Sequence, residues 1–443
     1  MAANNIPKRI SGAIIHSFTT GVVPRVGLEY VTVGRKDEIH TLLGDLETIE
    51  EGGAAFRFVI GKYGSGKSFL LQLMRNHAME RGFVVLDADL SPERRFYGSK
   101  GQGLSTYREL VSNLSTKAKP DGGALSVLIE RWILTVQNEL VQQSGLSPSA
   151  PNFPSLVEKR IFEKVSQMEG MIHGFDFARV LHLYYKAHAD GQEEIKSSVL
   201  RWIRGEYGTK TEARSDLGVN SIITDETWYD YLKLLSQFVV LAGYKGLLVL
   251  IDELVNLYKI PQSITRQNNY EKILTIFNDT MQGKACHIGF FMGGTPPFLE
   301  DARRGVYSYE ALRSRLETGR FAQERYRDLQ APVLRLSTLS NEELFLLVER
   351  LSEIHAIHYQ YASSLTREDL LSFISIEWNR MGADLHITPR EVVRDFLEVL
   401  NILHQNPGFT METLFTGSGF DFHKPAPELG DEEIAEGFAE FEL

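Results

Sequence analysis

Residues 61–68 read Gly61-Lys62-Tyr63-Gly64-Ser65-Gly66-Lys67-Ser68, which fits the phosphate-binding pattern GxxxxGK[ST] at every fixed position. The apolar run Phe56–Ile60 precedes it and a helical stretch, Phe69–Met74, follows. The sequence therefore predicts a strand, a loop and a helix in that order. A glycine-rich turn can match this pattern by chance, so the weight of the match depends on other motifs placed further along the chain.

The residue types of this loop suit the phosphates of a nucleotide. Glycines let backbone N–H groups turn inward, and the helix N-terminus adds partial positive charge. Lys67 is expected to reach the β- and γ-phosphates, and Ser68 to ligate Mg²⁺. The predicted cofactors are therefore ATP and Mg²⁺, and the predicted binding residues of the loop are Gly61, Gly64, Ser65, Gly66, Lys67 and Ser68.

Composition is that of an ordinary soluble globular protein. The chain has 443 residues, of which 43% are hydrophobic and 24% charged. A net charge of −11 argues against a surface that binds nucleic acid throughout, although it allows a local basic channel. The one cysteine, Cys286, cannot form an internal disulfide and is expected to be a small buried residue. We expect a cytoplasmic protein, with neither a signal peptide nor a transmembrane helix.

Five short apolar runs are predicted to be strands. Each is continuous rather than alternating, as in parallel strands that are buried on both sides. Helical stretches separate them, which predicts an α/β sheet with helices on both faces. The predicted strands are Phe56–Ile60, Val84–Asp87, Leu247–Asp252, His287–Met292 and Val333–Leu336.

The spacing of these strands predicts three parts. Residues 1–336 form an ATPase core, and a mostly helical insertion of about residues 91–228 lies within it. Residues 337–410 form a helical lid whose helices begin at Ser340, Thr366 and Thr388-Pro389, all good capping sequences. Residues 411–443 form an acidic tail that either only solubilises the chain or docks on a partner through Phe438–Leu443.

A second motif supports the first. The apolar run Leu247–Ile251 ends in Asp252 and Glu253, as in a Walker B strand, where open α/β sheets bind ligands. Asp252 is expected to hold Mg²⁺, directly or through water, and Glu253 to polarise the attacking water. Thr295 follows the next strand and either orients that water or is an ordinary turn residue.

Arginines later in the chain are candidates for contacts with the nucleotide. Arg313 and Arg315 lie two apart on a predicted helix and so point to different sides. Arg315 is favoured over Arg313 as an arginine finger that reaches a neighbouring subunit's γ-phosphate, the alternative being a solvated basic face. Arg390 begins a lid helix, where it either swings onto the nucleotide or is an ordinary exposed arginine. Near the N-terminus, Val33-Gly34-Arg35 is expected to form a strap that packs on adenine.

Together these residues resemble the motifs of a known class of ATPases. The order of Val33-Gly34-Arg35, the two Walker motifs, Thr295, Arg315 and Thr388-Pro389-Arg390 resembles AAA+ ATPases of the origin-recognition-like clade. Several stretches, Gly21–Arg25, Leu200–Glu206, Leu247–Tyr258 and Phe441–Leu443, are similar to the ATP-binding proteins of bacterial BREX-type phage-defence loci (BrxD-like). The resemblance implies an AAA+ P-loop core and a role in defence. No winged-helix pattern follows the lid, so sequence-specific reading of duplex DNA is not expected.

The sequence leaves several functions open. One is a homo-oligomeric ring or arc, with a trans arginine finger, that remodels or loads a nucleic-acid or protein partner of a defence locus. Another is an ATP-dependent scaffold with slow hydrolysis, and a weaker third is a small-molecule kinase. Any DNA binding is expected to be non-specific, through a segment with Arg94, Arg95 and Lys100 or one with Arg201, Arg204 and Lys210.

Other residue clusters are interpreted as structural. His355 and His358 have helical spacing but no cysteine or carboxylate cluster beside them, so we expect surface histidines rather than a metal site. The tryptophans Trp132, Trp202, Trp228 and Trp378 are expected in the core. Only Trp202, between Arg201 and Arg204, also resembles a base-stacking platform.

Overall fold

The computed structural model describes residues 6–317, 319, 327–381 and 388–416. The chain divides into two compact units. The phosphate-loop unit consists of residues up to 37, residues 60–73 and residues from 335 onward. The sheet unit consists of residues 38–59 and 74–334. The chain passes from one unit to the other within α3 (Lys36–Glu50), at the end of its first strand, within the helix that follows the phosphate loop, and at the end of its last strand.

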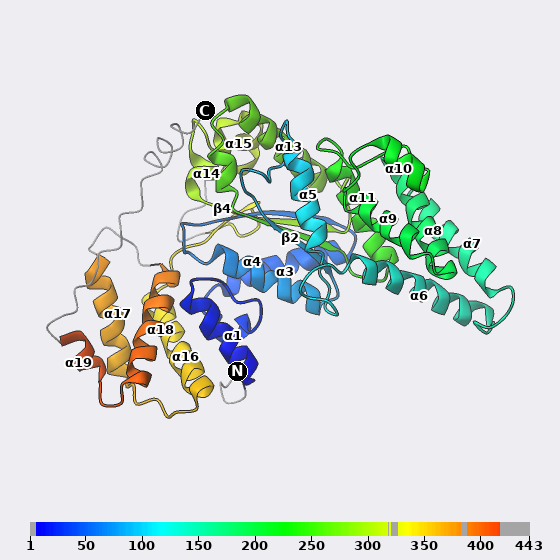
Figure 1. The fold of residues 1–443 in the computed structure, drawn as a ribbon. Helices are drawn as coiled ribbons and strands as arrows, with labels where there is room; N and C mark the ends of the chain where they lie inside the picture. The colour runs from blue at the N-terminus through cyan, green and yellow to red at the C-terminus, as the bar shows by residue number, and fades with distance from the viewer. Residues whose placement is uncertain (1–5, 318, 320–326, 382–387, 417–443) are drawn as a thin grey trace. The chain divides into compact units, whose positions relative to one another are not determined.

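The sheet unit is built on a parallel sheet of five strands (Figure 1). The strands lie in the order β2-β3-β4-β1-β5. This confirms the predicted α/β fold, with β2 and β4 each running two residues beyond their predicted ends. The bounds are β1 (Ala54–Ile60), β2 (Val84–Asp89), β3 (Leu247–Asp252), β4 (Ile288–Gly294) and β5 (Val333–Arg335).

Helices cover both faces of this sheet, as successive residues of β4 show. A side chain at Gly289 would meet Ile49 of α3 (Lys36–Glu50) at 2.4 Å, so the strand approaches this helix closely. The ring of the next residue, Phe290, lies 6.1 Å from the ring of Tyr229 in α11 (Trp228–Leu241). Because successive side chains of a strand point to opposite faces, α3 and α11 cover opposite faces (Figure 1).

The long segment between β2 and α11 is helical, as predicted. Its helices are α5 (Gln102–Ser112), α6 (Leu125–Ser144), α7 (Phe153–Ser166), α8 (Gly174–Asp190), α9 (Glu193–Ile203) and α10 (Lys210–Leu217). Trp132 and Trp202 are buried in it, and the Trp202 indole N–H donates to the Ser221 carbonyl at 2.8 Å. Trp202 is therefore a core residue rather than a stacking platform. The bounds of the insertion as a domain stay a prediction.

Shorter elements complete the sheet unit and join it to the phosphate loop. After β1 and its loop comes α4 (Lys67–Glu80). After β3 the chain forms α12 (Val255–Tyr258) and α13 (Ser263–Met281), and after β4 it forms α14 (Pro296–Glu300), η2 (Val306–Ser308) and α15 (Glu310–Leu316). The ends of β3 and β4 thus lead into the segments that carry the predicted catalytic residues.

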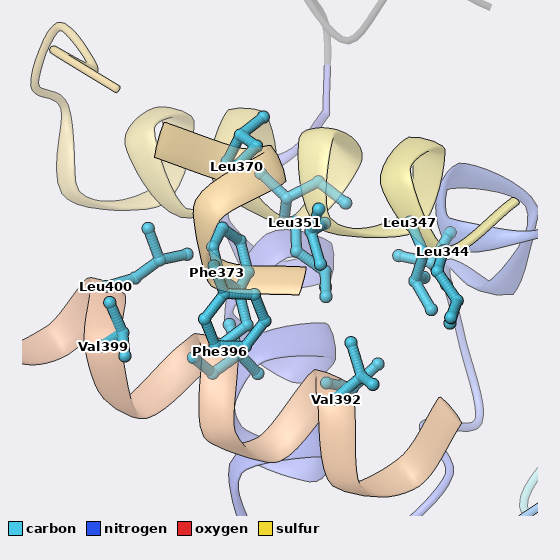
Figure 2. Packing of buried hydrophobic residues seen from close by; sticks show 14 of the residues in the cluster. Leu344, Leu347, Leu351, Leu370, Phe373, Val392, Phe396, Val399 and Leu400 are labelled. Atoms are coloured by element: carbon cyan, nitrogen blue, oxygen red, sulfur yellow. The ribbon is translucent and has the colours of Figure 1, made fainter. Parts of the chain in front are cut away.

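The phosphate-loop unit has an apolar core to which both ends of the chain contribute. Its helices are α1 (Lys8–Thr19), α2 (Leu28–Val31), α16 (Asn341–Tyr359), α17 (Arg367–Met381), α18 (Pro389–Gln405) and α19 (Met411–Thr416). The rings of Phe373 in α17 and Phe396 in α18 lie 4.9 Å apart, and Leu347 of α16 belongs to the same cluster (Figure 2). Ile14 of α1 joins the same cluster. The N-terminal segment and the predicted lid therefore share one core, and the lid's bounds as a domain stay a prediction.

Capping fixes where the helices of this unit begin. Ser340 and Thr388 each form a reciprocal capping box with a glutamate three residues on, as predicted. Thr366 exchanges the equivalent bonds with Asp369. Each cap satisfies backbone N–H groups that the first helical turn leaves without a partner. The N-cap of α18 is thereby set at Thr388, two residues before Arg390.

Three expectations about burial were wrong. His355 is fully buried instead of lying at the surface, because its Nδ1 meets the Tyr361 hydroxyl at 2.9 Å and its Nε2 meets the Asn401 amide oxygen at 3.2 Å. Trp378 is 43% exposed rather than in the core. Cys286 is half-buried rather than in the core, since it lies in the segment between α13 and β4.

Candidate functional site

The phosphate loop has the predicted local structure. β1 ends at Ile60 and α4 begins at Lys67, so the loop comprises the six residues between them. Gly64 and Gly66 have φ angles of +72° and +93°, which residues with a Cβ rarely adopt. Lys67 and Ser68 consequently form the first turn of α4, where the helix N-terminus attracts anions. The sequence pattern is thus realised as a strand, a loop and a helix.

The polar side chains of the loop are organised around its backbone. The Lys67 ammonium donates to the carbonyls of Gly61 and Lys62, both at 2.9 Å. Ser65 is 6% exposed, and its hydroxyl has no hydrogen-bond partner among the described residues. Ser68 is exposed. The loop therefore holds a cation and two hydroxyls close together, a set of groups that suits a phosphate chain.

The predicted N-terminal strap lies against this loop. Val33 belongs to the unit's apolar core, and Gly34 and Arg35 both have left-handed backbone conformations. The Arg35 guanidinium donates to the carbonyls of Ser65, at 3.2 Å, and Ser337. A side chain at Gly34 would collide with the Glu343 carboxylate, 2.2 Å from its Cβ. The strap is therefore locked between the loop and α16, and its contact with adenine stays a prediction.

Arg390 also reaches the loop. It lies on the first turn of α18, and its Nε donates to the Gly21 carbonyl at 3.0 Å. Its guanidinium carbon is 5.1 Å from the centre of the Tyr63 ring. The Thr388 hydroxyl would be 2.8 Å from a Cβ at Gly64. The structure thus brings both predicted arginines, Arg35 and Arg390, to the loop, whereas the sequence analysis gave no role to Tyr63.

The second candidate region is the end of β3 in the sheet unit. Glu253 has a φ of +60°, an unfavourable conformation for a residue that is not glycine. Its N–H donates to the Asp252 carboxylate at 2.8 Å. The Asn256 amide donates to the Glu253 carbonyl at 3.2 Å and to the Leu90 carbonyl at 2.9 Å. Such strain persists only where the surroundings hold it, and it concentrates at functional sites.

A third carboxylate, which the sequence analysis missed, lies beside these two. Asp89 ends β2 and is in register with Asp252. Partial withdrawal from water raises the pKa of Asp89 to about 6, with further upward contributions from Asp252, Glu253 and Asp87. The alternation Asp87-Ala88-Asp89 could have extended the predicted strand to include it. The carboxyl ends of β2 and β3 therefore carry three crowded acids.

Thr295 follows the neighbouring strand at the same edge. β4 pairs with β3 in parallel, and Thr295 comes directly after it. Its hydroxyl is buried without a hydrogen-bond partner among the described residues, and it does not cap α14. A buried hydroxyl in this state is costly unless a ligand or water satisfies it. This placement fits the predicted role in orienting a water molecule.

Arg313 and Arg315 lie on α15 and are both exposed. Arg313 pairs with Glu317 at 3.3 Å, and Arg315 donates to the Ala311 carbonyl one turn earlier in the same helix. Of the other arginines near this helix, Arg327 pairs with Glu38 at 2.7 Å, and Arg304 lies over the Tyr258 ring. Arg320 and Arg325 lie outside the described residues. The finger role of Arg315 stays a prediction.

The two candidate DNA-binding segments differ. Arg201 pairs with Glu212 at 2.6 Å and stacks on the Tyr207 ring, so its charge is already engaged. Arg94 lies near Glu109 at 3.7 Å. Arg95 has a buried Nε without a hydrogen-bond partner among the described residues, and partial burial lowers its pKa. DNA binding through either segment stays a prediction.

No cluster of three or more acidic, histidine or cysteine side chains suited to a metal ion occurs in the described part of the chain. Within the same residues, no helix is long and apolar enough to cross a membrane. The C-terminal residues 431–443, which include the predicted docking peptide, lie outside the described chain.

The chain is similar to a known protein family. The sequence model of a family described as "BREX system ATP-binding protein BrxC/D" matches residues 6–418. The match covers nearly the whole chain, including both Walker motifs, Thr295, Arg315 and Arg390. No curated protein matches the chain.

Proposed function

The chain belongs to the family of BREX system ATP-binding proteins BrxC/D, and we propose that it hydrolyses ATP as an oligomeric motor or switch. The ATP-binding character and the link to a BREX defence system come from the family. Hydrolysis, Mg²⁺, the oligomer and the remodelled partner are the proposal. The partner we propose is a nucleic acid or another protein of the defence locus.

The residues of the phosphate loop and those at the carboxyl end of β3 have different proposed roles. Lys67 and the loop N–H groups bind the β- and γ-phosphates. Ser68 in the phosphate-loop unit and Asp252 in the sheet unit stay the Mg²⁺ ligands predicted from the sequence, and the ion would supply positive charge to the phosphates. Crowding of Asp89, Asp252 and Glu253, visible in the raised pKa of Asp89, fits a site that a cation stabilises. Glu253 accepts a proton from the attacking water, which Thr295 orients.

The observation that carries hydrolysis, rather than ATP binding alone, is the conformation of Glu253. Its left-handed backbone is held by Asp252 and Asn256, and its side chain is exposed at the carboxyl edge of the sheet. A carboxylate that served only packing would not need this strain. The unsatisfied Thr295 hydroxyl on the adjacent strand supports the same reading.

Steady-state ATP turnover of the wild type and of Glu253→Gln, each with and without DNA, tests the proposal. Loss of a general base lowers turnover by about 10²–10⁴, and the amide keeps the size of the side chain. We expect that loss in Glu253→Gln, with ATP affinity retained. Equal turnover in the two proteins would contradict hydrolysis at this site. Turnover near background in the wild type under both conditions would favour an ATP-dependent scaffold.

A further inference from the structure

Tyr63 lies in the middle of the phosphate loop. Its side chain is 57% exposed although it is aromatic. The Arg390 guanidinium carbon lies 5.1 Å from the centre of its ring. The same guanidinium donates through Nε to the Gly21 carbonyl at 3.0 Å. A ring from the loop and a carbonyl from the N-terminal segment therefore hold the end of one long side chain from α18.

The base of this side chain is fixed as well. The capping box at Thr388 sets the start of α18, and Val392 and Phe396 anchor its apolar face in the core of the phosphate-loop unit (Figure 2). Thr388 also packs against Gly64 of the loop. Only the long side chain of Arg390 then remains to be oriented, and a flexible arginine loses entropy when it binds a ligand.

We propose that Tyr63 is a positioning residue, whose ring holds Arg390 ready for the γ-phosphate and so gives the loop its preference for ATP over ADP. A planar guanidinium stacks on an aromatic face and keeps its edge donors available for a phosphate. ATP carries one more phosphate than ADP, so a cation positioned at the γ-phosphate strengthens the binding of ATP but not that of ADP. This inference rests on the proposed nucleotide binding by the loop.

The test uses four variants of the full chain and measures Kd for ATP and for ADP by calorimetry. Tyr63→Leu keeps an apolar side chain but removes the π face, and Tyr63→Phe is the matched control that keeps the ring. Arg390→Ala removes the cation. The double variant Tyr63→Leu with Arg390→Ala closes a cycle that isolates the pair.

We expect Tyr63→Leu to weaken ATP binding by about two- to fivefold and to leave ADP binding unchanged. Tyr63→Phe should match the wild type, and the double variant should match Arg390→Ala alone. Equal losses for ATP and ADP, a Tyr63→Phe variant as weak as Tyr63→Leu, or additive effects in the double variant would each overturn the inference. If the wild type binds neither nucleotide, the proposed function itself fails.

Discussion

The charged groups of the phosphate loop and those at the carboxyl end of β3 have opposite surroundings. Around the loop, the cations Lys67, Arg35 and Arg390 each donate to backbone carbonyls. At the end of β3, partial withdrawal from water and, to a smaller extent, the neighbouring carboxylates Asp252, Glu253 and Asp87 raise the pKa of Asp89 to about 6. The loop is therefore stable with its cations in place, whereas the acidic edge carries strain and repulsion.

This difference indicates that nucleotide binding and catalysis depend on different regions of the chain. Carbonyl groups hold the loop's cations only weakly compared with a phosphate, since a charge-assisted bond to an anion is stronger than a bond to a neutral acceptor. A phosphate is therefore expected to replace these carbonyl bonds when a nucleotide binds. The acidic edge gains most from a cation, because a cation relieves the repulsion among its acids. The variants below change one region at a time.

The largest expected effect lies outside both regions. If Arg315 acts as a finger, Arg315→Ala should lower turnover by about 10³-fold or more, as in other phosphoryl-transfer systems. Arg313→Ala, two residues away and paired with Glu317, is the matched control and should keep most activity. Mixing Arg315→Ala with Lys67→Ala subunits should restore part of the turnover. A fully active Arg315→Ala variant would exclude the finger role, and an inactive Arg315→Ala variant whose mixture with Lys67→Ala also stays inactive would contradict action in trans.

Asn256→Ala should give an intermediate effect confined to the acidic edge. The change removes the bonds to the Leu90 and Glu253 carbonyls, so the left-handed turn at Glu253 loses its support. Since each lost bond is worth about 0.5–1.5 kcal/mol, we expect turnover to fall roughly tenfold with ATP affinity unchanged. A matching loss of ATP affinity would show that the two regions are not separable in this way.

The smallest expected effect is a pH dependence from Asp89. Its pKa is raised from 3.8 to about 6, so the folded state holds this proton more tightly than the unfolded chain does. Stability contributed by the protonated form is therefore lost as pH rises from about 4 to about 6. Asp89→Asn should be more stable than the wild type above pH 6, by less than about 1 kcal/mol because the residue is exposed and screened.

Urea unfolding at pH 7.5 and at pH 4 checks this prediction. The stability gain of Asp89→Asn should be present at the higher pH and absent at the lower one. A gain of equal size at both pH values would show that the repulsion assigned to Asp89 is not its source.

The sequence predicted the features that are encoded locally. The loop from Gly61 to Ser68, the strand Leu247–Asp252 and the caps at Ser340 and Thr388 all depend on neighbouring residues. The remaining features depend on contacts between distant parts of the chain. Asn256 lies 166 residues from its partner Leu90, and Arg390 lies 369 residues from Gly21. No local sequence pattern predicts such long-range hydrogen bonds.

The surroundings of polar residues also depend on contacts between distant parts of the chain. Asp89 could be placed beside Asp252 only once the register of β2 and β3 was known. His355 is polar, yet it lies on the buried face of α16, where Asn401 of α18 and Tyr361 accommodate its ring in the core. Helical periodicity indicates which face of a helix is apolar, but it does not show which polar residues find partners inside.

Equilibrium binding of ATP to the wild type, Lys67→Ala and Glu253→Gln tests the central claim most directly. The account assigns nucleotide binding to the phosphate loop and chemistry to the acidic edge. It predicts that Lys67→Ala loses ATP binding, because Lys67 contacts the phosphates in the ground state, and that Glu253→Gln binds as the wild type does. Equal ATP affinity in the wild type and Lys67→Ala would contradict it.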